Sequence, residues 1–201
     1  MKKLLVILLF AFVITLGFSG AVSAADANGH EKSIKKHHKC TDRHFIEHMV
    51  PHHQMAVKMA NIASTRAEHP EIKHLARNIK IGQSAEIKEM RQWYRKWYGK
   101  DIPTSRMMDH RNSMMSAVDL NRLKTAKHFD KEFIRQMVPH HQMAVMMSRM
   151  VLNNTKHPEI RKLANSIIKS QSAEIKEMRQ WYKKWYGTSL PTRPVMMCSM
   201  G

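Results

Sequence analysis

The sequence predicts an all-helical protein: an antiparallel four-helix bundle made of two copies of one helical hairpin. Two observations carry this prediction, a long internal repeat and a helical spacing of apolar residues within each copy. FIEHMVPHHQMAVKMA at 45–60 recurs as FIRQMVPHHQMAVMMS at 133–148, and QSAEIKEMRQWY at 83–94 recurs at 171–182. Both recurrences are offset by 88 residues (133 against 45, 171 against 83), so the two copies should form equivalent structural units.

Each copy contains two apolar stripes at steps of three and four residues, as core-facing helices require. The first helix presents Phe45, Met49, His52, Ala56, Met59 and Ala63, and its partner presents Ile72, Ala76, Ile79, Gln83, Glu86, Met90, Trp93 and Trp97. Pro70 and Pro158 suit the first turn of a helix, and Gly99 and Gly187 suit its end. We expect helices of roughly 20 to 28 residues.

The N-terminus has the pattern of a secretory signal peptide, with a positive start, an apolar run and a small-residue site near Ala24 or Ala25. The mature protein should therefore be exported, to the periplasm or the medium, without a transmembrane segment. The expected organisation is a signal peptide at 1–25, a mobile His-rich segment at 26–40, a first hairpin at 41–99, a Met-containing connector at 100–128 with a short helix after Asp119, a second hairpin at 129–187 and a Met/Cys-rich tail at 188–201.

The composition combines 18 Met and 14 His with a formal net charge of +18. Thioethers suit Cu(I) and imidazoles suit Cu(II) and Zn(II), so the mixture favours copper, or another soft metal such as silver, over calcium, magnesium or manganese. A Met-rich core is the structural alternative. The positive charge allows a second function, a cationic envelope-interaction protein that binds anionic lipid or cell-wall polymers. Export argues against a nucleic-acid partner.

Polar residues interrupt the apolar stripes at equivalent positions: His52, Gln83 and Glu86 in the first copy, and His140, Gln171 and Glu174 in the second. If the first hairpin turns near Ala67, His52 lies beside Gln83 and Met49 lies near Glu86. A polar layer should then cross the bundle, either as a hydrogen-bonded network or as a metal site, because unpaired buried polar groups cost about 1–3 kcal/mol each.

The second copy places His140, Met143, Met147 and Met150 along one side of a helix. The first copy repeats the pattern with His52, Met55 and Met59, but Ile62 replaces the fourth ligand. The neighbouring His53 and His141 point about 100° away, toward another partner or toward water. The candidate ligands in the bundle are Met49, His52, His53, Met55, Met59, Glu86, Met90, Met137, His140, His141, Met143, Met147, Met150, Glu174 and Met178. Pro51 and Pro139 predict kinks beside the histidines.

Secondary metal candidates lie outside the bundle. They are His37, His38, Cys40, Met107, Met108, His110, Met114, Met115, Met196, Met197, Cys198 and Met200. Cys40 and Cys198 could form a disulfide instead, because export permits oxidation and a bundle of this topology brings both chain ends to one pole.

The aromatic and basic helix ends, WYRKWYGK and WYKKWYGT, allow three interpretations: nucleic-acid stacking, a membrane-interface belt or core packing. Core packing is favoured because Trp93, Trp97, Trp181 and Trp185 continue the apolar stripes.

The paired MVPHHQMA motifs, each followed by HPEI and QSAEIKEM, resemble the exported family named domain of unknown function 305, which includes CopM-like periplasmic copper-binding proteins. The resemblance covers residues 41–187. It implies a ferritin-like fold, copper binding in the periplasm, and a role in metal resistance or delivery, with a copper-transfer protein as a possible partner. The ligands it implies are His52, His53, Met55, Met59, His140, His141, Met143 and Met147.

The ferritin-like resemblance also raises the alternative of a di-metal oxidase. Such enzymes use Glu-x-x-His pairs, whereas Met90 and Met178 follow one turn after Glu86 and Glu174. Arg135 is the counterpart of Glu47, so carboxylates are scarce, and the sequence contains no nucleophile with an orienting base. We expect binding of Cu(I), with Cu(II) as a second candidate ion, for sequestration or delivery rather than catalysis.

Overall fold

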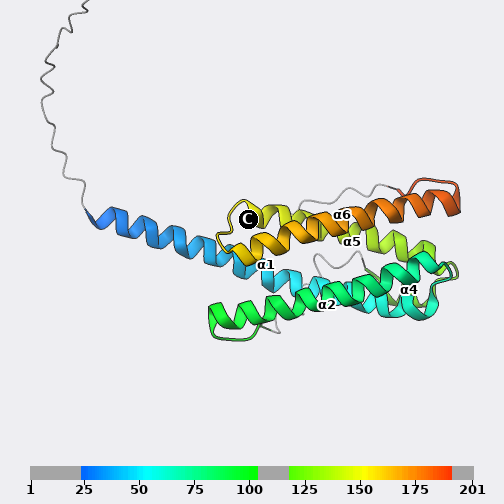
Figure 1. Ribbon diagram of the computed structural model, residues 1–201, viewed down its shortest axis with the longest axis horizontal. Helices are drawn as coiled ribbons and strands as arrows, with labels where there is room; N and C mark the ends of the chain where they lie inside the picture. The colour runs from blue at the N-terminus through cyan, green and yellow to red at the C-terminus, as the bar shows by residue number, and fades with distance from the viewer. Residues whose placement is uncertain (1–23, 104–117, 192–201) are drawn as a thin grey trace, which may run out of the picture.

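The computed structural model describes residues 24–103 and 118–191, with side chains described from residue 42 onward. These residues form five helices and no strand (Figure 1). The helices are α1 (Ala24–Arg66), α2 (Pro70–Tyr98), α4 (Leu120–Thr125), α5 (Phe129–Leu152) and α6 (Pro158–Tyr186). The predicted all-helical class is confirmed.

Prolines and glycines delimit the helices as the sequence predicts. Pro70 and Pro158 are the first residues of α2 and α6, where a missing N–H leaves no helical hydrogen bond unmade. Gly99 and Gly187 end these helices with φ of 68°, the left-handed conformation that glycine adopts without strain. Their N–H groups donate to the carbonyls of Arg95 and Lys183 at 2.9 and 3.0 Å.

Two hairpins, joined mainly through α1 and α5, organise the fold. Helix α1 packs against α2, α5 packs against α6, and α1 packs against α5 to join the hairpins (Figure 1). Pro51 lies within α1 and Pro139 lies within α5. The junction between the two copies is therefore formed by the helices that carry the MVPHHQMA motifs.

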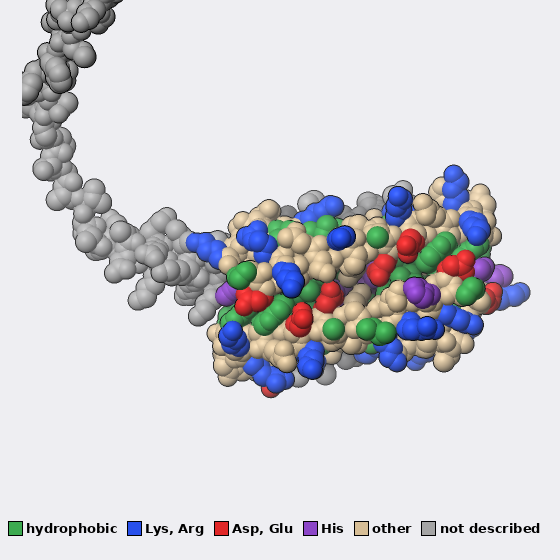
Figure 2. Space-filling model, viewed as in Figure 1, with side chains coloured by type: hydrophobic (Ala, Val, Ile, Leu, Met, Phe, Trp, Pro, Cys, Tyr) green, Lys and Arg blue, Asp and Glu red, His purple; other side chains and the backbone are tan. Residues whose placement is uncertain are grey.

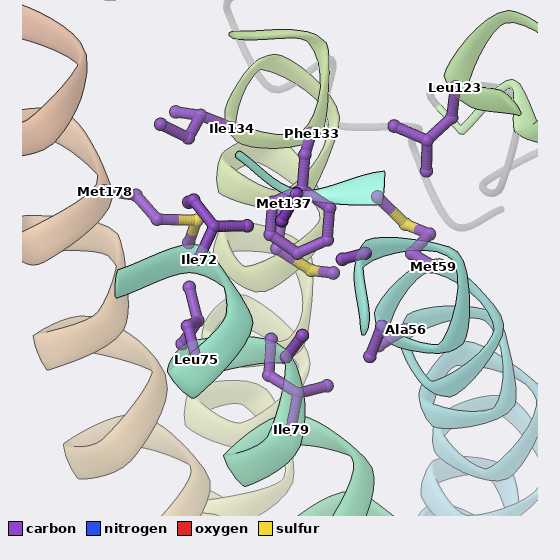
Figure 3. Packing of buried hydrophobic residues seen from close by; sticks show 14 of the residues in the cluster. Ala56, Met59, Ile72, Leu75, Ile79, Leu123, Phe133, Ile134, Met137 and Met178 are labelled. Atoms are coloured by element: carbon purple, nitrogen blue, oxygen red, sulfur yellow. The ribbon is translucent and has the colours of Figure 1, made fainter. Parts of the chain in front are cut away.

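The core consists of two buried clusters, related by the repeat. One joins the end of α1 and the start of α2 to the start of α5 and the end of α6, and Figure 3 shows the sulfur atoms of Met59, Met137 and Met178 within it. The other contains Phe45, Met49 and Met90 together with the C-terminal half of α5 and the N-terminal half of α6. Along α1 and α5 the paired histidines fall between the two clusters.

The short helix expected after Asp119 is present as α4. Asp119 precedes it, and its carboxylate accepts a hydrogen bond from the Arg122 backbone N–H at 2.9 Å, which satisfies one of the unpaired amides of the first turn. Gln136 of α5 accepts from the Asp119 N–H at 2.9 Å and donates to its carbonyl at 3.1 Å. These bonds fix α4 on α5.

Helix lengths depart from the expected range, most of all in α1, which has 43 residues. It begins at Ala24, so residues 26–40, expected as a mobile segment, are helical. Apart from Gly29, this stretch contains neither proline nor glycine to interrupt a helix. Helices α2 and α6, with 29 residues each, slightly exceed the expectation.

The aromatic helix ends pack against the core, as favoured, but the tyrosines are buried more deeply than the tryptophans. Tyr94 and Tyr182 are 0% and 2% exposed, whereas the four tryptophans are only partly buried at the cluster edges. Residues 1–23 of the predicted signal peptide, the Met-rich stretch of the connector and most of the C-terminal tail lie outside the described residues. Within 24–103 and 118–191, no helix combines the length and apolar character needed to span a membrane.

Candidate metal centre

The centre of the molecule contains a pair of stacked imidazoles. His52 of α1 and His140 of α5 occupy equivalent repeat positions, and their ring centroids lie 3.6 Å apart with an interplanar angle of 28°. Both side chains are buried, at 5% and 4% exposure. The predicted polar layer therefore exists, and it lies at the contact between the two hairpins.

The adjacent histidines face acidic partners within their own hairpins. His53 Nε2 lies 2.8 Å from Glu86 Oε2, and His141 Nε2 lies 2.6 Å from Glu174 Oε2. Both histidines are 0% exposed. Of the two orientations considered, the one toward water is therefore wrong.

The expected hairpin register needs a correction. We predicted Met49 near Glu86, but Glu86 meets His53, one helical turn further along α1. The loop occupies residues 67–69 and α2 begins at Pro70, so the turn is centred later than Ala67. Glu86 and Glu174, both among the candidate ligands, lie within hydrogen-bonding distance of His53 and His141.

Burial controls the charge of the stacked pair. Desolvation lowers the pKa of His52 and of His140 well below the ordinary value of 6.5, and the neighbouring imidazoles lower both further. Both rings are therefore neutral at pH 7. Neutral imidazole is the form that binds metals, since protonation occupies the lone pair that a metal needs.

Several buried polar atoms of this layer have no hydrogen-bond partner among the described residues. They are Nδ1 of His52, His53 and His141, both ring nitrogens of His140, and the side-chain oxygens of Gln83 and Gln171. Each such atom costs about 1–3 kcal/mol unless a water or an ion satisfies it. The imidazole nitrogens, set between two Met-containing clusters, fit a soft or borderline metal ion, whereas the amide oxygens alone would suit harder cations.

The methionine candidates divide by burial. Met49, Met59, Met90, Met137 and Met178 are fully buried within the two clusters. Met55, Met143 and Met147 are half-buried, and Met147 packs against the second cluster.

Met150 lies away from the layer. It is 43% exposed and, with Met146, lines a groove of about 1050 Å³ between α5 and α6. Among the described residues, no three His, Cys, Asp or Glu side chains are grouped closely enough to hold a metal ion. A metal in the layer therefore needs thioether or amide donors beside the imidazoles.

The secondary candidates could not be placed in the same way. His37, His38 and Cys40 lie on the helical backbone of α1, where side chains are not described, so the Cys40–Cys198 alternatives stay open. The others lie outside the described residues: Met107, Met108, His110, Met114, Met115, Met196, Met197, Cys198 and Met200.

Sequence reasoning missed two contacts that lock the hairpins together. The Asp130 carboxylate accepts from the His69 N–H at 2.8 Å and lies 2.6 Å from His69 Nδ1. The repeat-related pair, His157 Nδ1 and Asp42 Oδ2, is 3.5 Å apart. Each pair joins the loop of one hairpin to the first helix of the other. Both pairs keep the repeat offset, a signal that was available in the sequence.

Fold and site together define a class: an all-helical protein with a buried, imidazole-containing layer between two repeated hairpins. The chain belongs to the DUF305 family, a domain of unknown function, whose model matches residues 42–182. The resemblance inferred from the MVPHHQMA motifs is thereby confirmed.

Solved structures provide closer relatives. The chain is similar to CopM in its Cu(I)-bound form, with 55% identity over 73% of this chain and 98% of that one, and a TM-score of 0.65. For the Cu(II)-bound form of CopM the identity is 56% over 72% and 97% of the two chains, with a TM-score of 0.69. A putative secreted DUF305 protein from Streptomyces coelicolor, 23% identical over 76% and 98% with a TM-score of 0.66, shows the fold alone.

One curated relative aligns with this chain over only part of the relative's length. Uncharacterized protein L153 of Acanthamoeba polyphaga mimivirus is 51% identical over 49 residues. The match covers 24% of this chain and 32% of the relative, so the chain spans about a third of that protein.

Proposed function

We propose that the protein is an exported copper-binding protein that sequesters or delivers copper through Met and His ligands, and so contributes to metal homeostasis or resistance. The observation that carries this proposal is the set of unpartnered imidazole nitrogens in a buried layer between Met-rich clusters. Binding rather than turnover is the proposed activity.

His52 and His140 are the proposed central ligands, because they are neutral, buried and in contact across the junction. Met55 and Met143 lie three residues further along the same helices, on the face that the histidines share. Thioethers at these positions would favour Cu(I), or the similarly soft silver ion, over hard cations.

His53 and His141 are proposed as flanking ligands that Glu86 and Glu174 orient. A carboxylate that accepts the Nε2–H of an imidazole leaves the Nδ1 lone pair available for a metal. In both histidines it is Nδ1 that has no partner. The arrangement is the one by which proteins commonly orient metal-binding histidines.

The comparisons support the choice of metal. CopM, more than half identical to this chain over most of its length, has been solved with Cu(I), Cu(II) and silver. We extend copper binding to this chain because its own buried layer supplies the soft donors that such ions need.

Export and the finer architecture belong to the same proposal. The signal-peptide pattern at 1–25 supports export to the periplasm or the medium. An antiparallel ferritin-like four-helix bundle is supported by the pairing of α1 with α2, α5 with α6, and α1 with α5. An experimental structure of the exported protein would test the bundle topology, and N-terminal sequencing of the secreted protein would test cleavage.

An anaerobic Cu(I) titration against a chromogenic chelator tests the function. The parent should compete with the chelator, and a variant with His52, Met55, Met59, His140, Met143 and Met147 replaced should lose sites while circular dichroism shows an unchanged helical content. A control in which the exposed His74 and His128 are replaced by Gln should bind like the parent. Equal binding by parent and six-site variant would move the copper site out of the layer.

If no protein competes with the chelator, the copper function is wrong and anionic polymers become the next ligands to test. Figure 2 shows Lys and Arg side chains scattered over the visible face rather than gathered in one patch. Binding that depends on such charges should weaken steeply with salt.

A further inference from the structure

The second hairpin contains an open groove of about 1050 Å³ between α5 and α6, which lie side by side (Figure 1). Its α5 wall is largely apolar, because Val145, Met146 and Met150 follow one another along it. Met150 is 43% exposed, and it is one of only two exposed large apolar side chains among the described residues. Methionine side chains adapt their shape to different ligands, so Met-lined surfaces are common at binding sites. This wall is therefore suited to a flexible apolar ligand.

The α6 wall of the same groove is basic. Lys176, Arg179 and Lys183 are spaced by three and four residues, so they share one face of the helix. None of the three forms an ion pair within the described part of the chain. The buried Nε of Arg179 also has no hydrogen-bond partner there. Glu174 and Glu177 line a separate cavity against α2, and none of the described residues that line the groove is acidic. The groove therefore combines an apolar wall with uncompensated positive charge.

The first hairpin does not reproduce this combination. Lys58 is the counterpart of Met146 at the repeat offset of 88 residues, so the equivalent position on α1 is charged rather than apolar. After α2, Asp101 lies 2.6 Å from the Arg95 guanidinium and compensates its charge. The counterpart of Asp101 in the second hairpin is Ser189, which lines the groove and carries no charge. The groove is thus a feature of the second copy and does not follow from the repeat.

The two walls define the chemistry of a ligand. It must present an apolar chain to α5 and an anionic group to α6, within the roughly 16 Å that separate Ser172 from Lys183 along the helix at 1.5 Å per residue. An anionic phospholipid has both parts. Its phosphate oxygens accept charge-assisted hydrogen bonds, which the unpartnered Arg179 guanidinium is suited to donate. An acidic polymer would satisfy the basic wall but would leave the apolar wall in water.

We propose that the α5–α6 groove binds an anionic phospholipid of the cell envelope. One acyl chain lies against Met146 and Met150, and the headgroup phosphate binds Arg179 between Lys176 and Lys183. The inference goes beyond copper binding and does not depend on it. A lipid bound in this way would hold the exported protein at the membrane surface through a specific contact, in addition to the general attraction of a basic protein to anionic lipid.

The test uses the metal-free protein without its signal peptide and vesicles made of equal parts of phosphatidylcholine and phosphatidylglycerol. Vesicle sedimentation measures the affinity. K176Q/R179Q/K183Q should bind at least about tenfold more weakly than K88Q/R91Q/R95Q, equivalent to 1.4 kcal/mol. The second variant is the matched control, because it removes three charges of the same kind at the equivalent positions of α2. General attraction between charges would weaken binding equally in both variants.

The variant M146K separates contact with the acyl chain from attraction between charges. It adds a positive charge, so general attraction alone would tighten binding to the vesicles. Loss of the apolar wall should instead weaken binding several-fold. A lysine already occupies the equivalent position of α1 in Lys58, so the helix should tolerate the change. Circular dichroism should show an unchanged helical content in every variant.

Four outcomes would overturn the inference. Equal losses in the two triple variants would reduce lipid binding to net charge, and tighter binding by M146K would exclude the acyl contact. Polyglutamate that binds as tightly as the vesicles, with the same dependence on Lys176, Arg179 and Lys183, would make an acidic polymer the occupant. If the chain shortened at Pro191 binds vesicles and the full chain does not, residues 192–201 are the occupant. None of these outcomes bears on copper binding, which the chelator titration measures separately.

Discussion

The ring of His52 stacks on the ring of His140, its own equivalent in the second repeat, with 3.6 Å between centroids. The contact joins α1 of one hairpin to α5 of the other. Neither hairpin contains this pair alone, so the candidate site exists only where the two copies meet. A centre built in this way should respond equally to changes in either copy.

Replacing one histidine should therefore disable one shared site. We expect H52Q and H140Q each to weaken Cu(I) binding at least about tenfold. The double variant H52Q/H140Q should add little to either single change, because the losses in binding free energy are not additive for two residues that bind the same ion. Competition with a Cu(I) chelator measures all three. Fully additive losses of binding free energy in the double variant would indicate two independent sites and contradict the shared centre. H74Q, which replaces an exposed histidine, is the control.

Glu86 and Glu174 should tune metal binding without providing it. E86Q or E174Q removes the carboxylate that holds His53 or His141, and loss of such an orienting partner lowers metal affinity about 10- to 100-fold. The number of bound ions should stay the same in the chelator titration. The matched control is E89Q, because Glu89 is exposed on the same helix. A reduced ion count in E86Q would instead identify Glu86 as a ligand.

The buried pair should make the metal-free protein acid-sensitive. Since burial lowers the pKa of His52 and His140 in the folded state, the unfolded chain binds more protons once the pH falls below about 6.5, and stability falls with it. The slope should approach about 1.4 kcal/mol per pH unit for each histidine. Urea unfolding between pH 8 and pH 5 measures it. H52L/H140L should show a shallower slope, and an equal slope would place the acid sensitivity elsewhere.

Asp130 should contribute to stability more than its position at a helix start suggests. Its carboxylate accepts from the backbone N–H groups of Glu68 and His69 and contacts the His69 ring, at 1–2% exposure. D130A should cost about 2–4 kcal/mol in the free energy of unfolding, because it leaves buried donors unpaired. Urea unfolding compares it with D101A, which removes an exposed ion pair with Arg95 and should cost less than about 1 kcal/mol. Similar losses in both would refute the locking contact.

Much of the fold could be predicted from local patterns. The repeat identified the equivalent units. Pro70 marked a helix start because proline lacks the N–H that the first turn does not need, and Gly99 marked a helix end because glycine adopts the left-handed conformation without strain. Asp119 marked the start of a short helix. The six positions that spacing predicted for the apolar stripe of α1, from Phe45 to Ala63, are all buried. These features depend on residues near one another in sequence.

The geometry of the site depends on packing between helices. A shift of one helical turn in the hairpin register moved Glu86 from Met49 to His53, because the loop ends at His69. The stacking of His52 on His140 depends on how α1 meets α5, which no spacing within one helix specifies. Tyr94 is buried deeper than the tryptophans, and its hydroxyl donates a hydrogen bond to Glu47, a contact between two helices that spacing within one helix does not reveal.

The most direct measurement is a crystal structure of the Cu(I)-loaded protein with an anomalous difference map at the copper edge. We predict a copper peak between α1 and α5, bound by a nitrogen of His52 or His140 and by at least one Met sulfur. A map with no copper in this layer, and copper only at ligands outside 42–182, would contradict the proposal that the duplicated MVPHHQMA motifs form the metal centre.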